Sequence, residues 1–382
     1  MRIAYISPTP LSDLDISQIS EAQKIMDVTY YITVTPNTRQ RAAIDLSSFN
    51  KKFGIYCALD IPELAKYGTL LDLSKVYIVN YTWLRTWNPK SFFQAYKFYR
   101  YLKENGFDVL HFTWPCKYNE FIMYLLRKKM VLTVHDPFPH SSQISFIREI
   151  ERKVAFSMID RLVLLNKNQK DDFVKFYRLH NKRILETKLS RYDYLKIYEN
   201  KGTQKTEMVL FFGSILSHKG LDYLLPAMEI VHEKCPNAKL VVAGKGKIYF
   251  DISPYLGKDY IDIRNRFIQD EELAELIQQC SVVAVPYIDA TQSGVVMSAY
   301  AFNRPCVATE VGGLPEMVVH EQMGLIVPPK DVQALADAIC KLLDDDSLQT
   351  KFSSNIEKEY STGMLSWTYI VNQYKQMYDS VL

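Results

Sequence analysis

Short, uninterrupted apolar runs recur along this chain, and longer amphipathic segments separate them. In the first half of the chain the apolar runs cover residues 3–7, 108–112, 130–135 and 161–165. Segments with the apolar spacing of helices lie near residues 91–104, 118–128, 145–157 and 167–177. Strands that are apolar throughout and alternate with helices are typical of a parallel sheet covered on both faces. Residues 27–80 break this alternation, and we expect irregular or antiparallel pieces there.

The pattern restarts after a polar stretch at residues 200–206. New apolar runs cover residues 208–213, 238–243, 282–286 and 306–309. Helical spacing lies near residues 219–233, 270–279, 293–303, 330–345 and 367–382. A chain of 382 residues is long enough for two domains. The sequence therefore predicts an α/β protein with two doubly wound domains, at residues 1–202 and 203–363, and a closing helix at 364–382.

The charge of the chain is unevenly distributed. Residues 1–200 contain 30 Lys and Arg against 20 Asp and Glu, a net of +10, whereas residues 201–382 contain 16 against 23, a net of −7. The basic half favours an anionic acceptor or a membrane surface as partner, although a chance excess of lysine on solvated helices would give the same count. No zinc finger, RRM signature or dense arginine cluster is present, so nucleic acid is not expected as a partner.

Composition also bears on the compartment. The sequence has no apolar stretch of about 18 residues, so no transmembrane helix is expected. The apolar run before Pro8 is too short for a signal peptide. The six cysteines show no CxxC spacing and lie in apolar runs, which predicts reduced core residues with neither a zinc site nor a disulfide framework. These features predict a cytoplasmic protein.

Ligands of doubly wound sheets bind beyond the carboxyl ends of the strands, so the loops there, facing a cleft between the domains, are the candidates for chemistry. In the loop at 211–222 a strand ends at Gly213, and Lys219 lies at the start of a helix, where it can meet an anion that the helix also attracts. An ordinary solvated lysine is the alternative. In the loop at 287–298, Gly294 and small polar residues at a helix start would leave backbone N–H groups free to bind phosphate. The alternative is a plain helix cap by Thr291 or Ser293.

Two further loops are weaker candidates. The loop at 307–316 has two consecutive glycines that let the backbone approach a ligand, and Glu316 then either caps a helix or binds sugar hydroxyls. The loop at 134–140 begins with His135, which ends a buried strand and would point into the cleft, unless it is a structural histidine.

Taken together, in this order and spacing, these loops resemble those of the retaining, nucleotide-sugar-dependent glycosyltransferases of the GT-B fold, specifically family 4, the glycosyl transferases group 1. The resemblance covers most of the second half and rests on residues 213–220, 241–246, 307–316 and 323–329. In the first half it is looser and rests on residues 131–137 and 160–166. The helix that begins at Ser366-Trp367 resembles the one that crosses back onto the first domain in that family.

The resemblance implies an acceptor-binding Rossmann-like domain at 1–202, a nucleotide-sugar-binding Rossmann-like domain at 203–363 and a crossover helix at 364–382. It implies a metal-independent hexosyltransferase without a cofactor, acting on a glycan or lipid-linked acceptor in surface-polysaccharide assembly. Catalytic roles fall to His135, Lys219 and Asp289. Donor binding falls to Gly213, Ser214, Gly244, Arg266, Thr291, Gln292, Ser293, Gly294, Val295, Ser298 and Glu316.

The sequence also departs from the family pattern. The glycine-rich loop after the first strand is replaced by Ser7-Pro8-Thr9-Pro10, and Ser214 stands where an arginine is usual. The two glutamates of the family fall on Ala290 and Ser298, and Asp289 is the candidate substitute for the first. Two alternatives therefore stay open: an inactive subunit that binds a nucleotide sugar, and a nucleotide-sugar epimerase.

The segment at 91–104 interleaves aromatic residues with Lys97, Arg100 and Lys103. A helix of this kind can lie at an anionic bilayer surface, which would make the protein peripheral at the inner membrane face. Packing of the aromatic residues on the sheet is the alternative.

Overall fold

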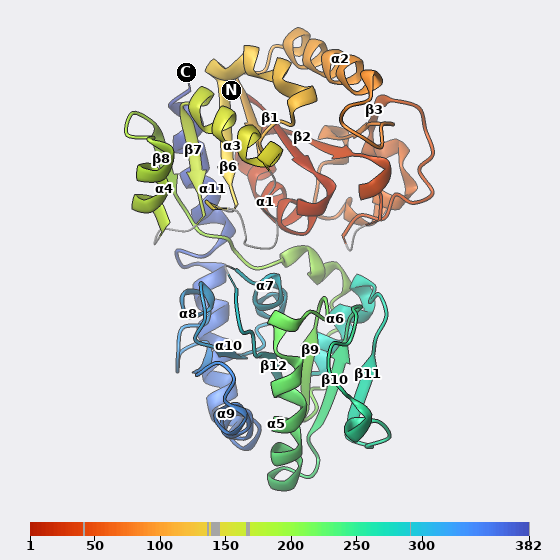
Figure 1. Ribbon diagram of the computed structural model, residues 1–382, viewed down its shortest axis with the longest axis vertical. Coiled ribbons are helices and arrows are strands. Elements are labelled where there is room, and N and C mark those ends of the chain that lie inside the picture. Colours follow the sequence, from red (N-terminus) through yellow and green to blue (C-terminus); the bar gives the residue numbers. More distant parts are fainter. Residues whose placement is uncertain (41–42, 136, 139–145, 166–168, 291, 382) are drawn as a thin grey trace. The chain divides into compact units, whose positions relative to one another are not determined.

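A computed structural model of the chain describes residues 1–382 except 41–42, 136, 139–145, 166–168, 291 and 382. The chain forms two compact units (Figure 1). Unit 1 is Met1–Ser190 together with Met364–Leu382, and unit 2 is Arg191–Gly363.

Unit 1 contains an eight-stranded sheet with the strand order β3-β4-β2-β1-β5-β6-β7-β8. Its strands are β1 (Arg2–Pro8), β2 (Asp27–Val34), β3 (Gly54–Cys57), β4 (Val76–Asn80), β5 (Val109–Phe112), β6 (Met130–Val134), β7 (Arg161–Leu164) and β8 (Arg183–Glu186). All neighbouring strands are parallel except β3, which pairs antiparallel with β4. The expected antiparallel piece within residues 27–80 is therefore present.

Helices cover both faces of the sheet in unit 1. The α-helices are α1 (Ser12–Ile25), α2 (Pro89–Asn105), α3 (Phe146–Met158), α4 (Lys170–Tyr177) and α11 (Trp367–Asp379). Short 3-10 helices are η1 (Thr9–Leu11), η2 (Pro36–Thr38), η3 (Ala58–Asp60), η4 (Pro62–Tyr67), η5 (Leu73–Lys75) and η6 (Tyr118–Lys129). The helical pattern near 118–128 thus forms a 3-10 helix, because apolar spacing over so few residues does not separate a period of 3.0 from one of 3.6.

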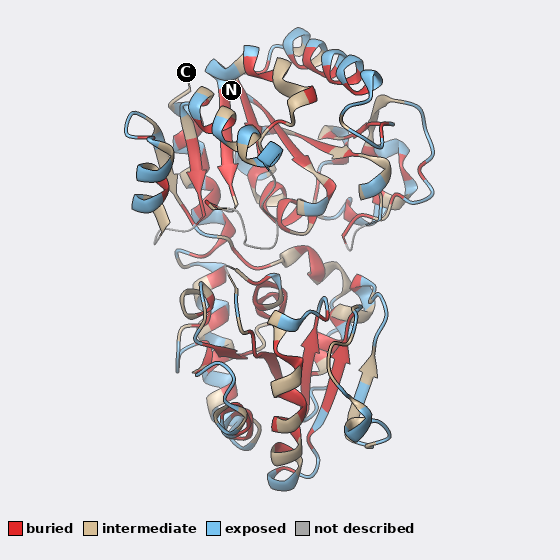
Figure 2. Ribbon diagram, in the orientation of Figure 1, coloured by how far each residue is buried: buried red, intermediate tan, exposed pale blue. Residues whose placement is uncertain are grey.

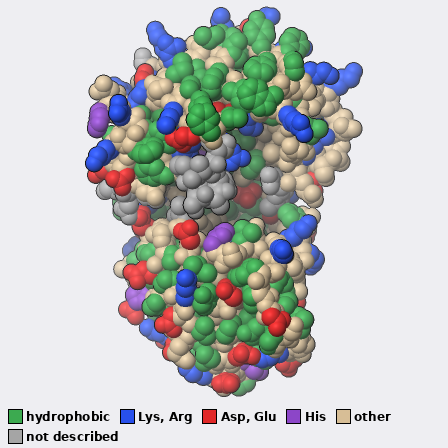
Figure 3. Space-filling model, in the orientation of Figure 1, with side chains coloured by type: hydrophobic (Ala, Val, Ile, Leu, Met, Phe, Trp, Pro, Cys, Tyr) green, Lys and Arg blue, Asp and Glu red, His purple; other side chains and the backbone are tan. Residues whose placement is uncertain are grey.

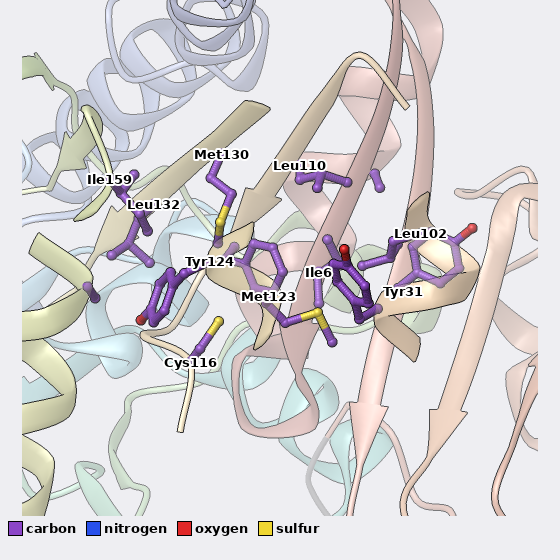
Figure 4. Packing of buried hydrophobic residues seen from close by; sticks show 14 of the residues in the cluster. Ile6, Tyr31, Leu102, Leu110, Cys116, Met123, Tyr124, Met130, Leu132 and Ile159 are labelled. Carbon is purple, nitrogen blue, oxygen red and sulfur yellow. The ribbon is translucent and has the colours of Figure 1, made fainter. Parts of the chain in front are cut away.

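One face of this sheet packs on α2 and η6. Figure 4 shows Leu102 of α2 and Met123 of η6 beside strand residues such as Ile6 and Leu110, all buried in one cluster. Burial of apolar side chains of this size is the main stabilising contribution to such a core.

The opposite face packs on α1 and α11. Tyr5 donates a hydrogen bond of 2.8 Å to Asp15 of α1, and the buried ring of His111 bonds through Nδ1 to the hydroxyl of Tyr378 on α11. Thr368 donates a hydrogen bond of 2.8 Å to Glu21 of α1. The C-terminal helix therefore returns to unit 1 and is held there by polar as well as apolar contacts.

Unit 2 contains a six-stranded parallel sheet with the order β11-β10-β9-β12-β13-β14. Its strands are β9 (Met208–Phe212), β10 (Lys239–Ala243), β11 (Ile261–Arg264), β12 (Val282–Val285), β13 (Cys306–Thr309) and β14 (Gly324–Val327). Its helices are η9 (Asp193–Tyr198), η10 (Ser217–Lys219), α5 (Leu221–Lys234), η11 (Ser253–Tyr255), α6 (Asp270–Gln279), α7 (Gly294–Ala301), α8 (Leu314–Met317), α9 (Val332–Asp344) and α10 (Asp346–Ser361). Figure 2 shows the inner strands of this sheet buried and the edge strand β11 only partly so, and α5 and α9 pack together on one face of the sheet.

Unit 2 begins at Arg191, ahead of the boundary expected at 202/203. The guanidinium of Arg191 is buried and lies 2.8 Å from Glu357 and 3.0 Å from Asn303. The backbone N–H of Tyr192 donates to the carbonyl of Met297 at 3.1 Å. These bonds attach residues 191–192 to α7 and α10. The sequence pattern had placed the boundary later, near the polar stretch at residues 200–206.

The structure shows the burial of the cysteines and the apolar character of the helices: one cysteine, Cys57, is only partly buried. All six cysteines are free thiols, and five of them are buried. No helix among the described residues is long and apolar enough to cross a membrane.

Candidate functional site

Three loops of unit 2 meet at the carboxyl ends of β9, β12 and β13. The N–H of Ile288 donates to the carbonyl of His218 at 2.8 Å, which joins the loops after β12 and β9. The N–H of Gly313 donates to the carbonyl of Ala290 at 3.3 Å, which joins the loops after β13 and β12. Because these bonds involve the backbone, the loops have one arrangement before any ligand binds.

Lys219 closes η10, two residues before α5 begins. Its ammonium lies 3.7 Å from the ring centroid of Tyr287, a cation–π contact. Among the described residues it forms no ion pair with a carboxylate. Burial lowers the pKa of Lys219 to about 8, because a desolvated ammonium is costly. This side chain is a cation without an anion, and a phosphate would relieve its desolvation.

The first turn of α7 lies beside this loop. Ser293 holds the N-cap position and is 2% exposed; its hydroxyl donates to Tyr287 at 3.2 Å and accepts no hydrogen bond from the first-turn N–H groups of the helix. The alternative of a plain side-chain cap is therefore not realised by Ser293, and its predicted role in donor binding stays a prediction. The first-turn N–H groups of an α-helix have no partner within the helix, and Gly294 is exposed there. Thr291, the other expected cap, lies outside the described residues, and Gln292 is half-buried beside it.

The glycines of the loops after β9 and β10 have different roles. Gly213 and Ser214 are exposed directly after β9, and a Cβ on Gly213 would lie 3.5 Å from the side chain of Val295, which places this loop against α7. A Cβ on Gly244 would lie 1.8 Å from the carbonyl oxygen of Gly213, so no side chain fits at 244. Gly244 therefore packs closely against the backbone of the loop after β9, in which Gly213 and Ser214 are exposed.

Gly294 is in close contact with Tyr192. A Cβ at 294 would lie 3.2 Å from the Tyr192 hydroxyl and 3.3 Å from its Cε2. A side chain at 294 would press on this ring in the absence of any phosphate. From the sequence, glycine at position 294 is predicted because it lets a phosphate approach the backbone. The close contact with Tyr192 is a second reason for glycine at this position.

Four other predicted site residues also lie in unit 2. Arg266 is exposed beyond the edge strand β11 and forms two bonds of 2.7 Å with Glu272, two strands away from β9. Ser298 is 6% exposed, and its hydroxyl donates to the carbonyl of Gly294 at 2.9 Å, so this hydroxyl proton is not available for a hydrogen bond to a ligand. Asp289 is exposed shortly after β12. Glu316 is half-buried in the four-residue helix α8.

His135 belongs to unit 1, where it directly follows β6. Its ring centroid lies 6.5 Å from that of Trp114, which follows β5. The Nε2 atom is buried and has no hydrogen-bond partner among the described residues. Burial lowers the pKa of His135 to about 4, so the imidazole is neutral at pH 7. A neutral imidazole with one unused nitrogen can accept or donate a hydrogen bond to a ligand.

Comparison with known proteins identifies unit 2. Residues 206–345 match the family model described as Glycosyl transferases group 1. Unit 2 carries a glycosyl transferases group 1 domain. An uncharacterized glycosyltransferase of Methanocaldococcus jannaschii is 30% identical over 216 residues, 55% of this chain and 55% of that protein. The alpha-D-kanosaminyltransferase of Streptomyces kanamyceticus is 26% identical over 164 residues, 42% of each chain. The matched part spans about half the length of these relatives.

A solved structure shares the fold over the whole chain. The HepE protein of Anabaena in complex with UDP has a TM-score of 0.66 at 16% identity, covering 100% of both chains. At this identity the similarity shows the fold alone, and it is the GT-B fold that the sequence predicted. The glycosyl transferases group 1 domain thus occupies the second unit of a GT-B chain.

Unit 1 contains a pocket that the sequence reasoning missed. Residues at or just beyond the carboxyl ends of β1, β2, β4 and β5 line it, including Tyr81, Trp83, Phe112 and Trp114. The signal was present, because aromatic residues come within three residues of the ends of β4 and β5. Polar residues and glycines are the usual sign of a ligand-binding loop, whereas aromatic residues in a sequence are typical of a buried core.

Within the described residues no group of His, Cys, Asp and Glu side chains could hold a metal ion. That the reaction needs no metal ion stays a prediction.

Proposed function

We propose that this protein is a retaining glycosyltransferase that moves a hexose from a nucleotide diphosphate sugar to a glycan or lipid-linked acceptor in surface-polysaccharide assembly. The observation that carries the proposal is the Lys219 ammonium, which forms no ion pair among the described residues and lies in a loop joined by a backbone hydrogen bond to the loop that leads into α7. A cation and unpaired backbone N–H groups at one sheet edge are what a diphosphate leaving group requires.

The proposed reaction follows from this arrangement. The hydroxyl oxygen of the acceptor forms a bond to the anomeric carbon on the face from which the diphosphate leaves. The bond between that carbon and the diphosphate oxygen breaks, and the electron pair stays with the diphosphate, which takes the proton of the acceptor. Negative charge grows on the diphosphate, and Lys219 and the N–H groups of Gly294 and Val295 stabilise it.

Two further residues have proposed roles in the reaction. Neutral His135 orients the donor sugar or the diphosphate through its unused Nε2. Asp289 takes the place of the missing glutamate beside the sugar, and its exposed carboxylate is accessible to it. Asp289→Asn should then lower kcat while leaving nucleoside diphosphate affinity unchanged, and a wild-type kcat would remove Asp289 from the mechanism.

The donor assay tests the activity. HepE was solved with UDP and with UDP-glucose, so UDP-sugars come first, followed by GDP-, dTDP- and ADP-sugars. We expect binding of one donor, release of the nucleoside diphosphate and a new glycosidic bond of retained configuration. Binding without turnover, with any acceptor or with water, would favour the inactive subunit, and an isomerised donor would favour the epimerase.

We also propose that unit 1 binds an anionic membrane surface through α2. Phe92 and Phe93 of α2 are 44% and 59% exposed, and the ammonium of Lys97 lies 4.5 Å from the Phe93 ring. Phe98 and Tyr99 of the same helix are buried in the core, so the proposal concerns only the exposed aromatic residues of α2. Figure 3 shows hydrophobic side chains gathered over the upper part of unit 1 with Lys and Arg around them.

Vesicle sedimentation tests this surface. The protein should bind phosphatidylglycerol vesicles at low salt, lose that binding as salt screens the lysines, and not bind phosphatidylcholine. Replacing both Phe92 and Phe93 by Ser should reduce binding, whereas replacing the exposed Phe176 of α4 should not. Equal binding by both variants would contradict the role of α2.

A further inference from the structure

The pocket of unit 1 has an aromatic lining. Tyr81, Trp83 and Phe112 are nearly buried, and Trp114 is 41% exposed beside them. The rings of Tyr81 and Trp83 lie 5.7 Å apart. Pro8, the last residue of β1, also lines the pocket. These surfaces favour a ligand that presents a flat apolar face.

The pocket also contains polar atoms that have no partner. Trp83 is 5% exposed, and its Nε1–H is buried without an acceptor among the described residues. The ammonium of Lys117 lies 5.0 Å from the Trp83 ring, and the carboxylate of Glu120 accepts a hydrogen bond of 3.2 Å from the Lys117 N–H. A hydrocarbon chain in this pocket would leave the indole N–H unpaired and would desolvate both charges. A ligand with hydroxyl groups would satisfy them.

The floor of the pocket is rigid. The hydroxyl of Ser7 donates to the buried carboxylate of Asp15 and accepts a hydrogen bond of 2.6 Å from Thr113. Ser7 therefore does not rearrange readily to fill the pocket, and Tyr81, Trp83 and Phe112 of the lining are part of the buried core. Because these residues are already ordered before a ligand binds, binding does not carry the entropy cost of ordering them.

We propose that this pocket binds a pyranose ring, with the C–H face of the sugar against Trp114 and a sugar hydroxyl accepting from Trp83 Nε1–H. A pyranose combines a flat C–H face with hydroxyl groups at its edge. The C–H face matches the aromatic rings of the lining, and the hydroxyl groups match its polar groups. The inference rests on the proposed function and narrows it: unit 1 recognises the acceptor by a sugar residue and not by a lipid chain. His135, 6.5 Å from the Trp114 ring, then lies next to the bound sugar.

The test uses the full-length protein without donor. Saturation-transfer NMR with methyl α-glucopyranoside, methyl α-mannopyranoside, methyl α-galactopyranoside and methyl N-acetyl-α-glucosaminide should show transfer to the C–H protons of at least one pyranoside. Trp114→Ala should weaken that binding by about tenfold, the scale for removing a central tryptophan contact. Phe176→Ala, which removes an exposed aromatic residue elsewhere in unit 1, should leave it unchanged.

Trp83→Phe is the second variant. It keeps a ring in the core and removes only the N–H, so it should fold, as thermal unfolding would verify, and bind the pyranoside about fivefold more weakly. Binding of n-octanol or farnesol in place of every pyranoside, or pyranoside binding that Trp114→Ala does not change, would overturn the proposal. UDP binding measured on the same samples separates the two proposals, because Lys219 and the first turn of α7, which are proposed to bind the diphosphate, lie in unit 2.

Discussion

The two units present different chemistry at the same structural position. In unit 2 the carboxyl edge of the sheet consists of glycines, small polar residues, one lysine and the start of a helix, joined by backbone hydrogen bonds. In unit 1 the corresponding edge consists of aromatic rings around a pocket, with an imidazole nearby. A doubly wound sheet thus determines where a site lies, and the loop residues determine whether it suits a phosphate or a sugar face.

The largest effect that we expect is from Lys219, which distinguishes the edge of unit 2 from that of unit 1. Lys219→Ala should lower turnover by about 100-fold, because it removes one preorganised electrostatic stabiliser. Steady-state kinetics with the true donor measures it. Lys239→Ala is the matched control, since Lys239 is an exposed lysine at the opposite end of β10. Unchanged kinetics in Lys219→Ala would remove this residue from the site, and pyranoside binding by unit 1 should be the same in both variants.

A second prediction separates the two explanations for Gly294. Gly294→Val should weaken UDP binding by roughly tenfold and affect uridine less, because it disturbs the phosphate end of the site. If the crowding comes from Tyr192, adding Tyr192→Ala should restore part of the lost affinity, and calorimetry on the four proteins of this double-mutant cycle measures the coupling. Additive losses would show that the phosphate alone requires glycine here, and equal losses for UDP and uridine would indicate misfolding.

The pH dependence should differ between the units. The protonated form of Lys219 binds the diphosphate, and its pKa in the free protein is about 8. UDP affinity should therefore be constant below pH 7 and fall as the pH rises through 8, by about tenfold at pH 9. His135 has a pKa of about 4 and stays neutral throughout, so pyranoside binding should not change between pH 6 and 9. UDP affinity that is flat to pH 9.5 would show that Lys219 is not the relevant cation.

The smallest effect should come from Ser298, which occupies one of the two glutamate positions of the family. Its hydroxyl is buried and donates to Gly294 within α7, so Ser298→Ala should change KM for the donor by no more than about threefold. A KM increase well above that, with kcat unchanged, would mean that this buried hydroxyl binds the ribose after all.

Much of the fold could be predicted from local patterns. Uninterrupted apolar runs predicted β1, β5, β6 and β7 to within two residues, since a strand buried on both faces must be apolar throughout. The edge strand β8 and the strands β11 and β14 were missed, because half-buried strands such as β8 and β11 have mixed composition. The helix α10 was missed because Asp345, which caps it, follows α9 directly and leaves no loop to see.

The candidate site was predictable only in part. The order of glycines and small polar residues in the loops pointed to Gly213, Lys219 and Gly294, because backbone approach and phosphate binding require particular residue types at particular positions. The sequence by itself therefore determined the fold class and the family of unit 2, and the kind of ligand at its edge stays a prediction.

The tertiary structure decided what each of those residues contacts. Only it placed the Lys219 ammonium on Tyr287, diverted the Ser293 hydroxyl away from the helix and set Tyr192 against Gly294. It alone gathered Trp83 and Trp114, which are separated by some 30 residues of chain, into one pocket. The physical reason is that neighbouring strands of a parallel sheet are joined by long crossovers, so the residues that meet at its edge are distant in sequence and leave no local pattern.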